Sequence, residues 1–268
     1  MITVKLQGGL GNQLFQYAFG RALMERGNEV AFDKSFFSSN IKYTNRPFSL
    51  EMFKLSPKVK IENSPQTLSI FKKIFYRLDN DRRVRYVKSF LTRPNDYMEG
   101  YYNSELYFKD IREQLLSELV LKEKSPEYLE MERLISDTPN SLVVHARRTD
   151  YLTSTGFTIL DESYYKRALE NFPADVRIFA FSDDPQWLVS ALGREAYVVS
   201  GKGLTDYEEL SLMTSGQNFI IANSTFSWWG AWLSQSRDKK VVAPASWFTS
   251  KLWWRANRDV VPEGWVRV

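Results

Sequence analysis

The chain has 268 residues, of which 43% are hydrophobic and 25% are charged, with a formal net charge of +4 at pH 7. These values are typical of a soluble globular protein long enough for one large domain or two smaller ones. With no cysteine and only one histidine, the sequence excludes disulfides and thiol chemistry and argues against a zinc site.

The amino-terminal residues "MITVKLQGGLGNQ" begin directly with a predicted strand. They lack the basic and apolar regions of a signal peptide, and no apolar run approaches the roughly 18 residues that span a bilayer. We therefore expect a cytoplasmic protein.

The first elements predict the start of a parallel α/β sheet. A strand over 2–6 leads into a glycine-rich loop, a helix from Asn12 to Arg26 and a second strand over 28–33. Gly9 and Gly11 are expected to let the backbone turn and approach a ligand. The loop imitates a dinucleotide fingerprint, but Leu14 stands where that motif has a third small residue. This argues against an oxidoreductase.

The middle of the chain is less regular. The segment from Ser69 to Pro94 predicts a basic amphipathic helix, which could pack on the core with a solvated face, bind an anionic membrane surface or bind nucleic acid. No nucleic-acid motif accompanies it. Residues 110–137 read as helices broken near Ser125, and the turn-forming residues 137–140 mark the end of a first domain over 1–138.

Strands and helices then alternate in a pattern that predicts a doubly wound α/β domain over 139–250. The expected strands cover 141–147, 176–182, 196–200, 218–222 and 240–244, and the helices cover 161–171, 185–192, 206–215 and 226–235. Asp206 and Glu209 have the spacing of a capping box. The final segment, 251–268, is expected to pack back across both halves.

Charged residues follow the buried strand in "SLVVHARRTDY". Side chains alternate along a strand, so His145 and Arg147 share one face and Arg148 the other. The planar guanidinium of Arg147 suits a phosphate group. Arg148 is a second candidate or the member of a structural ion pair. The alternative is that both arginines only pair with nearby carboxylates.

A second candidate phosphate site lies in "NSTFSWWGAWL", where a strand ends and a helix begins. Helix N-termini bind phosphate readily, although a plain N-cap has the same sequence pattern. The residues concerned are Asn223, Ser224, Thr225 and Ser227. The tryptophans that follow are expected in the core rather than on a sugar-binding surface.

The pair Asp183 and Asp184 follows another buried strand. These carboxylates could cap the next helix, accept hydrogen bonds from a base or ribose, or bind a metal ion. A lone acid pair is a weak magnesium signal, so we expect no metal.

Taken in order, these segments resemble the family 11 glycosyltransferases, mainly α-1,2-fucosyltransferases. The matching segments are "GGLGNQLFQYAFGRAL", "GYYNSELYF", "VVHARRTDY", "FAFSDDPQWL", "NSTFSWWGAWL" and "PASWF". The resemblance implies a GT-B architecture of two Rossmann-like halves with the active site in the cleft between them. It also implies GDP-β-L-fucose as donor, inversion at the anomeric carbon, and neither metal nor cofactor.

The resemblance also implies roles for single residues. Arg147 would hold the β-phosphate, and His145 with Asp183 and Asp184 would hold guanosine. The segment 223–227 would cradle the diphosphate through the residues named above. Facing the cleft from the first half would be Gly11, Asn12 and Gln13.

The resemblance leaves several candidates for the general base. Asp150 is the nearest carboxylate to the motif, with Asp161 or Glu162 as alternatives, and the departing phosphate could itself take the proton.

The acceptor is expected to be a galactose-terminated oligosaccharide or a lipid-linked glycan, contacted by the irregular region 34–110. This suggests an enzyme of surface-polysaccharide or O-antigen biosynthesis, peripheral on the inner membrane face, where the basic segment could help. A transferase of another sugar nucleotide or linkage, a nucleotide-dependent oxidoreductase and a non-catalytic carbohydrate-binding protein remain the alternatives.

Overall fold

The computed structural model describes residues 1–38, 47–63, 84–149, 151–153, 155–249 and 254–268. The chain divides into two compact units, which we call unit 1 (Met1–Lys122 with Leu252–Pro262) and unit 2 (Glu123–Lys251 with Glu263–Val268). The division falls earlier than the expected boundary at 138/139, because helix α7 (Pro126–Ser136) packs on helix α10 (Asp206–Met213) of unit 2.

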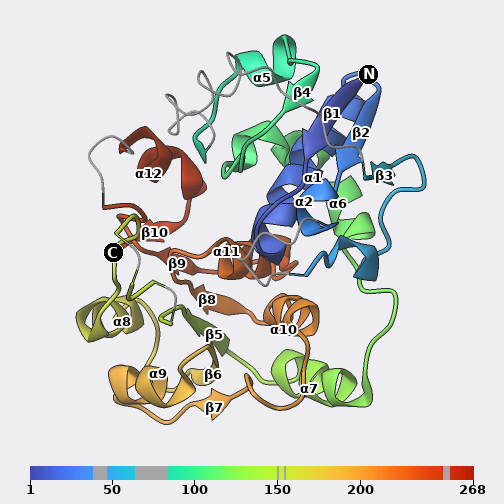
Figure 1. Ribbon diagram of the computed structural model, residues 1–268. Coiled ribbons are helices and arrows are strands. Elements are labelled where there is room, and N and C mark those ends of the chain that lie inside the picture. The colour runs from blue at the N-terminus through green and yellow to red at the C-terminus, as the bar shows by residue number, and fades with distance from the viewer. Residues whose placement is uncertain (39–46, 64–83, 150, 154, 250–253) are drawn as a thin grey trace. The chain divides into compact units, whose positions relative to one another are not determined.

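Unit 1 is built on a parallel sheet with the strand order β3-β2-β1-β4 (Figure 1). The strands are β1 (Ile2–Lys5), β2 (Val30–Asp33), β3 (Lys60–Glu62) and β4 (Tyr97–Met98). Its helices are α1 (Leu10–Glu25), α2 (Ser35–Ser38), α5 (Ser89–Thr92), α6 (Arg112–Glu118) and α12 (Trp254–Val260). Short 3-10 turns cover Leu50–Met52, Glu105–Tyr107 and Lys109–Ile111.

Helix α1 joins β1 to β2 and is buried on nearly all sides rather than on one face. It begins at Leu10, two residues before the expected start. A Cβ on Gly20 would lie 2.4 Å from the ring of Phe32, so only glycine allows the helix to lie this close to β2. In the preceding loop, Gly8 rather than Gly9 or Gly11 has a positive φ, at 79°.

Unit 2 is built on a larger parallel sheet with the strand order β10-β9-β8-β5-β6-β7 (Figure 1). The strands are β5 (Ser141–Ala146), β6 (Arg177–Ser182), β7 (Tyr197–Val198), β8 (Asn218–Ile220), β9 (Val241–Ala243) and β10 (Val266–Arg267). Besides α7 and α10, the helices are α8 (Glu162–Leu169), α9 (Pro185–Leu192) and α11 (Thr225–Leu233).

The sequence predicts the first five of these strands, and the edge strand β10 is additional. It comes from the last residues of the chain and pairs with β9 through Val266 and Val242. The capping box of α10 lies one residue earlier than expected and is formed by Thr205 and Glu208, not by Asp206 and Glu209.

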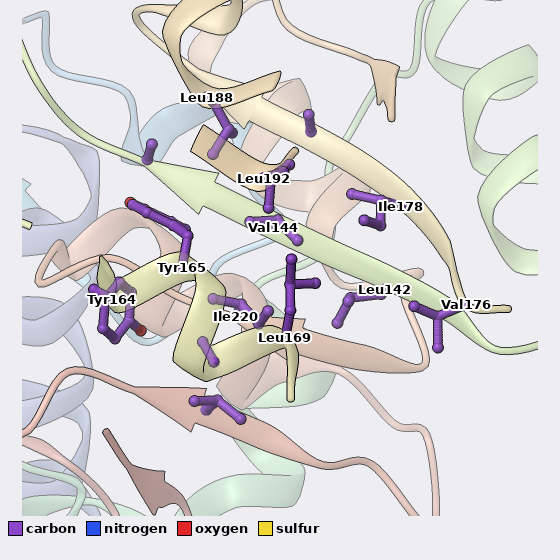
Figure 2. Close-up of a cluster of buried hydrophobic side chains, with 14 residues drawn as sticks. Leu142, Val144, Tyr164, Tyr165, Leu169, Val176, Ile178, Leu188, Leu192 and Ile220 are labelled. Atoms are coloured by element: carbon purple, nitrogen blue, oxygen red, sulfur yellow. The ribbon is translucent and has the colours of Figure 1, made fainter. Parts of the chain in front are cut away.

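The hydrophobic core of unit 2 fixes the orientation of β5 (Figure 2). Leu142 and Val144 point toward α8 and α9, where they pack with Tyr165 and Leu188. The opposite face of the strand contacts α11, since the ring of His145 lies 5.8 Å from that of Phe226. The predicted alternation of side chains along this strand is therefore confirmed.

The predicted basic helix over 69–94 lies largely outside the described residues, which resume at Val84. Within the described part of the chain, no helix has both the length and the apolar character needed to cross a membrane.

A buried ion pair links α1 to α6 in unit 1. The guanidinium of Arg21, which is 3% exposed, donates from Nε and Nη2 to the Glu118 carboxylate at 2.8–3.1 Å. The Tyr17 hydroxyl donates to the same carboxylate at 2.6 Å. A second carboxylate, Glu25, contacts Arg21 at 3.0 Å from a side chain that is 40% exposed.

These two carboxylates offer a matched test. Glu118→Gln should lower the free energy of unfolding by about 3 kcal/mol or more, because it removes the buried carboxylate that binds both Nε and Nη2 of Arg21 and leaves only the exposed Glu25 to compensate the charge. Glu25→Gln should cost less than about 1 kcal/mol, because water screens the exposed partner. Urea titration of both variants measures the difference, and equal losses would contradict this view of the ion pair.

Candidate functional site

The predicted site residues of unit 2 gather at one edge of its sheet. From β5 the chain continues to β6 and β7 on one side of the sheet, whereas β8, β9 and β10 lie on the other. The connection therefore reverses direction between β5 and β8. In parallel α/β sheets, ligands bind at the carboxyl ends of the strands beside such a reversal.

His145 lies at the carboxyl end of β5 and is 5% exposed. Its Nδ1 atom is buried and has no hydrogen-bond partner among the described residues. Burial first, and then the nearby charge of Arg147, lower the pKa of His145 to about 3. The imidazole is therefore neutral at physiological pH, when one ring nitrogen donates and the other accepts.

Asp183 follows β6 and contacts three successive residues after β5. Its Oδ1 accepts a hydrogen bond from the backbone N–H of Arg148 at 2.9 Å. Its Oδ2 accepts from the backbone N–H of Thr149 at 3.2 Å and from the Thr149 hydroxyl at 2.6 Å. The same oxygen lies 3.3 Å from Nε of Arg147. This carboxylate, expected to hold guanosine, thus accepts hydrogen bonds from the protein itself.

Arg148 points away from Arg147, as the alternation along the strand predicts. Its guanidinium lies over the Trp187 ring, 3.7 Å from the centroid, and its Nε is 3.5 Å from Oδ2 of Asp184. Asp184 caps α9 by accepting a hydrogen bond from the backbone N–H of Trp187 at 3.2 Å. Both residues thus have structural contacts, and their donor contacts stay a prediction.

The N-terminus of α11 carries the second predicted phosphate site. Ser224 is the N-cap and accepts from the backbone N–H of Phe226 at 3.4 Å. Ser227 is 1% exposed, and its hydroxyl donates to the Ser224 carbonyl at 3.3 Å. The Ser227 hydroxyl is thus used within the first turn of the helix. Ser224, the half-buried Thr225 and the first backbone N–H groups of the helix remain as candidates.

The Asn223 amide forms hydrogen bonds to two neighbouring loops, at Thr158 and at Trp247. Its Nδ2 donates to the carbonyl of Thr158 at 2.8 Å and to that of Trp247 at 3.0 Å. Its backbone carbonyl accepts from the Tyr151 hydroxyl at 3.1 Å, which connects the loop after β5 to the start of α11. Its buried Oδ1 has no hydrogen-bond partner in the described part of the chain.

The tryptophans of α11 belong to the core, as expected. Trp228 and Trp229 are 0% exposed, Trp232 is 4% exposed, and their rings pack on one another.

In unit 1, the three residues expected to face a cleft differ in their surroundings. Gln13 is fully buried, and its amide bonds the carbonyls of Gly8 and Pro47 and the backbone N–H of Ser49. These hydrogen bonds connect the loop over 47–49 to α1, so the side chain has a structural role in unit 1. Gly11 is buried and Asn12 is half-buried in the first turn of the helix.

Asp150, the predicted base, lies outside the described residues. Of the alternatives, Asp161 is the N-cap of α8. Hydrogen bonds from the Ser163 hydroxyl and the Tyr164 backbone N–H hold the pKa of Asp161 below its ordinary value, which makes it a weaker base. Glu162 forms a surface ion pair with Lys166 at 3.2 Å.

A polar chain that the sequence pattern does not predict lies at the same sheet edge. The backbone N–H of Ser182 donates to the Ser200 hydroxyl at 3.1 Å, which donates to Glu209 at 2.8 Å. Burial raises the pKa of the Glu209 carboxyl. Ser200 is the last residue of the strand predicted over 196–200, so its position at a carboxyl end was the available signal. Among the described residues, no group of three or more His, Asp or Glu side chains could hold a metal ion.

Two known proteins with similar sequences are glycosyltransferases of Escherichia coli. The O-antigen biosynthesis glycosyltransferase WbnK of Escherichia coli is 29% identical over 91% of this chain and 93% of its own length. An alpha-1,2-colitosyltransferase of Escherichia coli is 29% identical over 100% of this chain and 99% of its own length.

Among solved structures, the alpha-1,6-fucosyltransferase NodZ from Bradyrhizobium is similar, with a TM-score of 0.51 and 15% identity. The match covers 87% of this chain and 91% of that structure. This likeness shows the fold, which is an α/β fold of the GT-B type with two parallel sheets.

The model of the family described as "Glycosyl transferase family 11" matches residues 1–268, so it covers both sheets and every segment discussed above. The chain belongs to glycosyl transferase family 11.

Proposed function

We propose that this glycosyltransferase moves L-fucose from GDP-β-L-fucose to a glycan hydroxyl, with inversion and without a metal ion. The preferred acceptor is O2 of a terminal galactose, which gives an α-1,2 linkage. The observation that carries the proposal is the position of Arg147, at the carboxyl end of β5 beside the reversal of strand order.

The mechanism follows from where charge develops. As the bond between C1 of fucose and the phosphate oxygen breaks, its electron pair passes to the β-phosphate. Arg147 and the N-terminal N–H groups of α11 supply positive charge and hydrogen-bond donors for that developing anion. These groups are fixed before the reaction, so no reorganisation is needed as the bond breaks.

The acceptor hydroxyl attacks C1 from the face opposite the departing GDP and loses its proton to a base. Asp150 remains our proposed base because it closes the motif that holds His145 and Arg147. His145 does not suit this role, since a pKa near 3 makes it a very weak proton acceptor. As a neutral ring it suits a hydrogen bond to the nucleoside.

Colitose is the specific alternative to fucose as the transferred sugar, because a relative that matches the whole chain is an alpha-1,2-colitosyltransferase. Colitose differs from L-fucose only by lacking the C3 hydroxyl. A site that hydrogen-bonds this hydroxyl rejects the analogue strongly, whereas an apolar site does not. The relative WbnK favours an O-antigen intermediate as the acceptor, which we place at the cytoplasmic membrane face.

Donor competition with linkage analysis tests the function. The purified protein is offered equal amounts of GDP-fucose and GDP-colitose with a panel of galactose-terminated oligosaccharides, and the products are analysed by mass spectrometry and NMR. We expect fucose linked α-1,2 to galactose. Preferred transfer of colitose would assign the alternative donor, and transfer of neither sugar would overturn the proposal.

Two neighbouring arginines separate catalysis from stability. Arg147→Ala should lower kcat/KM for GDP-fucose by about a hundredfold or more while the protein stays folded. Arg148→Ala should instead lower the free energy of unfolding by about 1–2 kcal/mol, through loss of its contact with Trp187. Steady-state kinetics and urea unfolding of both variants measure this, and near-normal turnover by Arg147→Ala would remove the phosphate assignment.

The single histidine gives a pH test. His145 has a folded-state pKa near 3, whereas an unfolded histidine has about 6.5. As pH falls below about 6.5, the unfolded state takes up a proton that the folded state refuses. This contribution to stability is therefore present above pH 6.5 and lost toward pH 3. Between pH 7 and pH 5 the loss should reach about 2 kcal/mol.

Urea unfolding at both pH values measures the loss, with His145→Gln as the variant that should lack it. NMR provides an independent check, because the ring resonances of the only histidine should not shift between pH 5 and pH 8. A titration near pH 6.5 in the folded protein would contradict the buried, neutral state.

A further inference from the structure

The strand pairing between β5 and β6 ends where the candidate phosphate-binding segment begins. Ala146 and Ser182 form the last paired positions of the two strands. Beyond this point the chain after β5 has no further strand pairing to β6, although its backbone N–H groups still need acceptors. The next residue after β6 is Asp183, whose carboxylate supplies them.

Beyond the last backbone pair of β5 and β6, the Asp183 carboxylate takes over as the hydrogen-bond acceptor for the chain after β5. It accepts the backbone N–H groups of Arg148 and Thr149 and the Thr149 hydroxyl, and its fourth contact is Nε of Arg147. Three consecutive residues are thus tied to one side chain, which is itself only 17% exposed. This arrangement fixes both the backbone and the guanidinium of the segment.

The Arg147 side chain is 22% exposed, so it is held in place but accessible from solvent. Fixing an arginine before a ligand arrives lowers the conformational entropy lost on binding. Asp183 also carries a negative charge, which opposes direct binding of a phosphate to its own oxygens. Both considerations favour an indirect role for this residue.

We propose that Asp183 is a positioning residue, which orders the segment Arg147–Thr149 as a preformed binding segment for the diphosphate and does not contact guanosine. This inference rests on the proposed GDP-sugar donor. It assigns Asp183 to phosphate recognition through Arg147.

Binding of two ligands separates the indirect role from direct contact. Calorimetry with GDP and with guanosine is performed on the wild-type protein and on Asp183→Ala and Asp183→Asn. Asp183→Ala should weaken GDP binding by about ten- to a hundredfold, the size expected when charge-assisted hydrogen bonds are lost. Guanosine binding should change by less than about threefold, because it has no phosphate to meet the displaced arginine.

Asp183→Asn should fall between the two proteins, since its amide oxygen can still accept one backbone N–H while the charge facing Arg147 is gone. In the double variant Arg147→Ala/Asp183→Ala, GDP should bind no more weakly than to Arg147→Ala alone, which is the non-additivity expected of residues that act together. Ser125→Ala is the control, because it removes the N-cap of α7 in the same unit and should leave GDP binding unchanged.

Amide hydrogen exchange provides a readout without any ligand. The N–H groups of Arg148 and Thr149 should be protected in the wild-type protein and lose protection in Asp183→Ala, whereas Ser125→Ala should keep it. Retained protection in Asp183→Ala would overturn the proposal. So would equal weakening of guanosine and GDP, or no weakening of GDP.

Failure of the underlying function has a different signature. A wild-type protein that binds neither GDP nor guanosine would overturn the proposed donor, and with it the diphosphate role of the segment. The exchange experiment on the free protein would still decide whether Asp183 orders it.

Discussion

The burial of β5 on both faces is the constraint on which the rest of unit 2 depends. Every residue of Ser141–Ala146 is buried, so the strand can carry charged groups only after it ends. Parallel neighbours end at the same edge, which brings the segments after β5, β6 and β8 together. The ion pair between Arg147 and Asp183 is a direct result. The last residue of the buried strand, Ala146, is therefore followed directly by the charged candidate site residue Arg147.

Strand alternation is the part of the site that the sequence predicts best. It correctly separates His145 and Arg147 from Arg148, because a strand buried on both faces leaves no freedom in side-chain direction. The exact position of a helix N-cap is harder to predict from the sequence. Thr205 and Asp206 are both good N-cap residues, and Glu208 and Glu209 both follow at suitable spacing. Only packing of the helix decides that Glu208 completes the cap and Glu209 joins Ser200.

Uncharged polar residues in the matching motifs have structural roles that the sequence does not predict. Gln13, Asn223 and Ser227 all lie in segments that resemble a ligand-binding family, yet their side chains satisfy buried backbone groups. A buried carbonyl or N–H needs a partner as much as a ligand does, and the sequence does not distinguish the two needs. Strand β10 was not predicted for another reason. It has only two residues, and these form a strand only because they pair with β9.

The last residues of the chain take part in both units, with 252–262 in the first and 263–268 in the second. Neither unit contains all of its parts until translation has passed residue 262. During synthesis on the ribosome, β9 therefore has an unpaired edge that β10 later covers, and exposed strand edges promote association between chains. Pairing of β10 with β9 is thus a late event in folding, and a substitution that weakens this pairing leaves β9 as an exposed edge of the sheet.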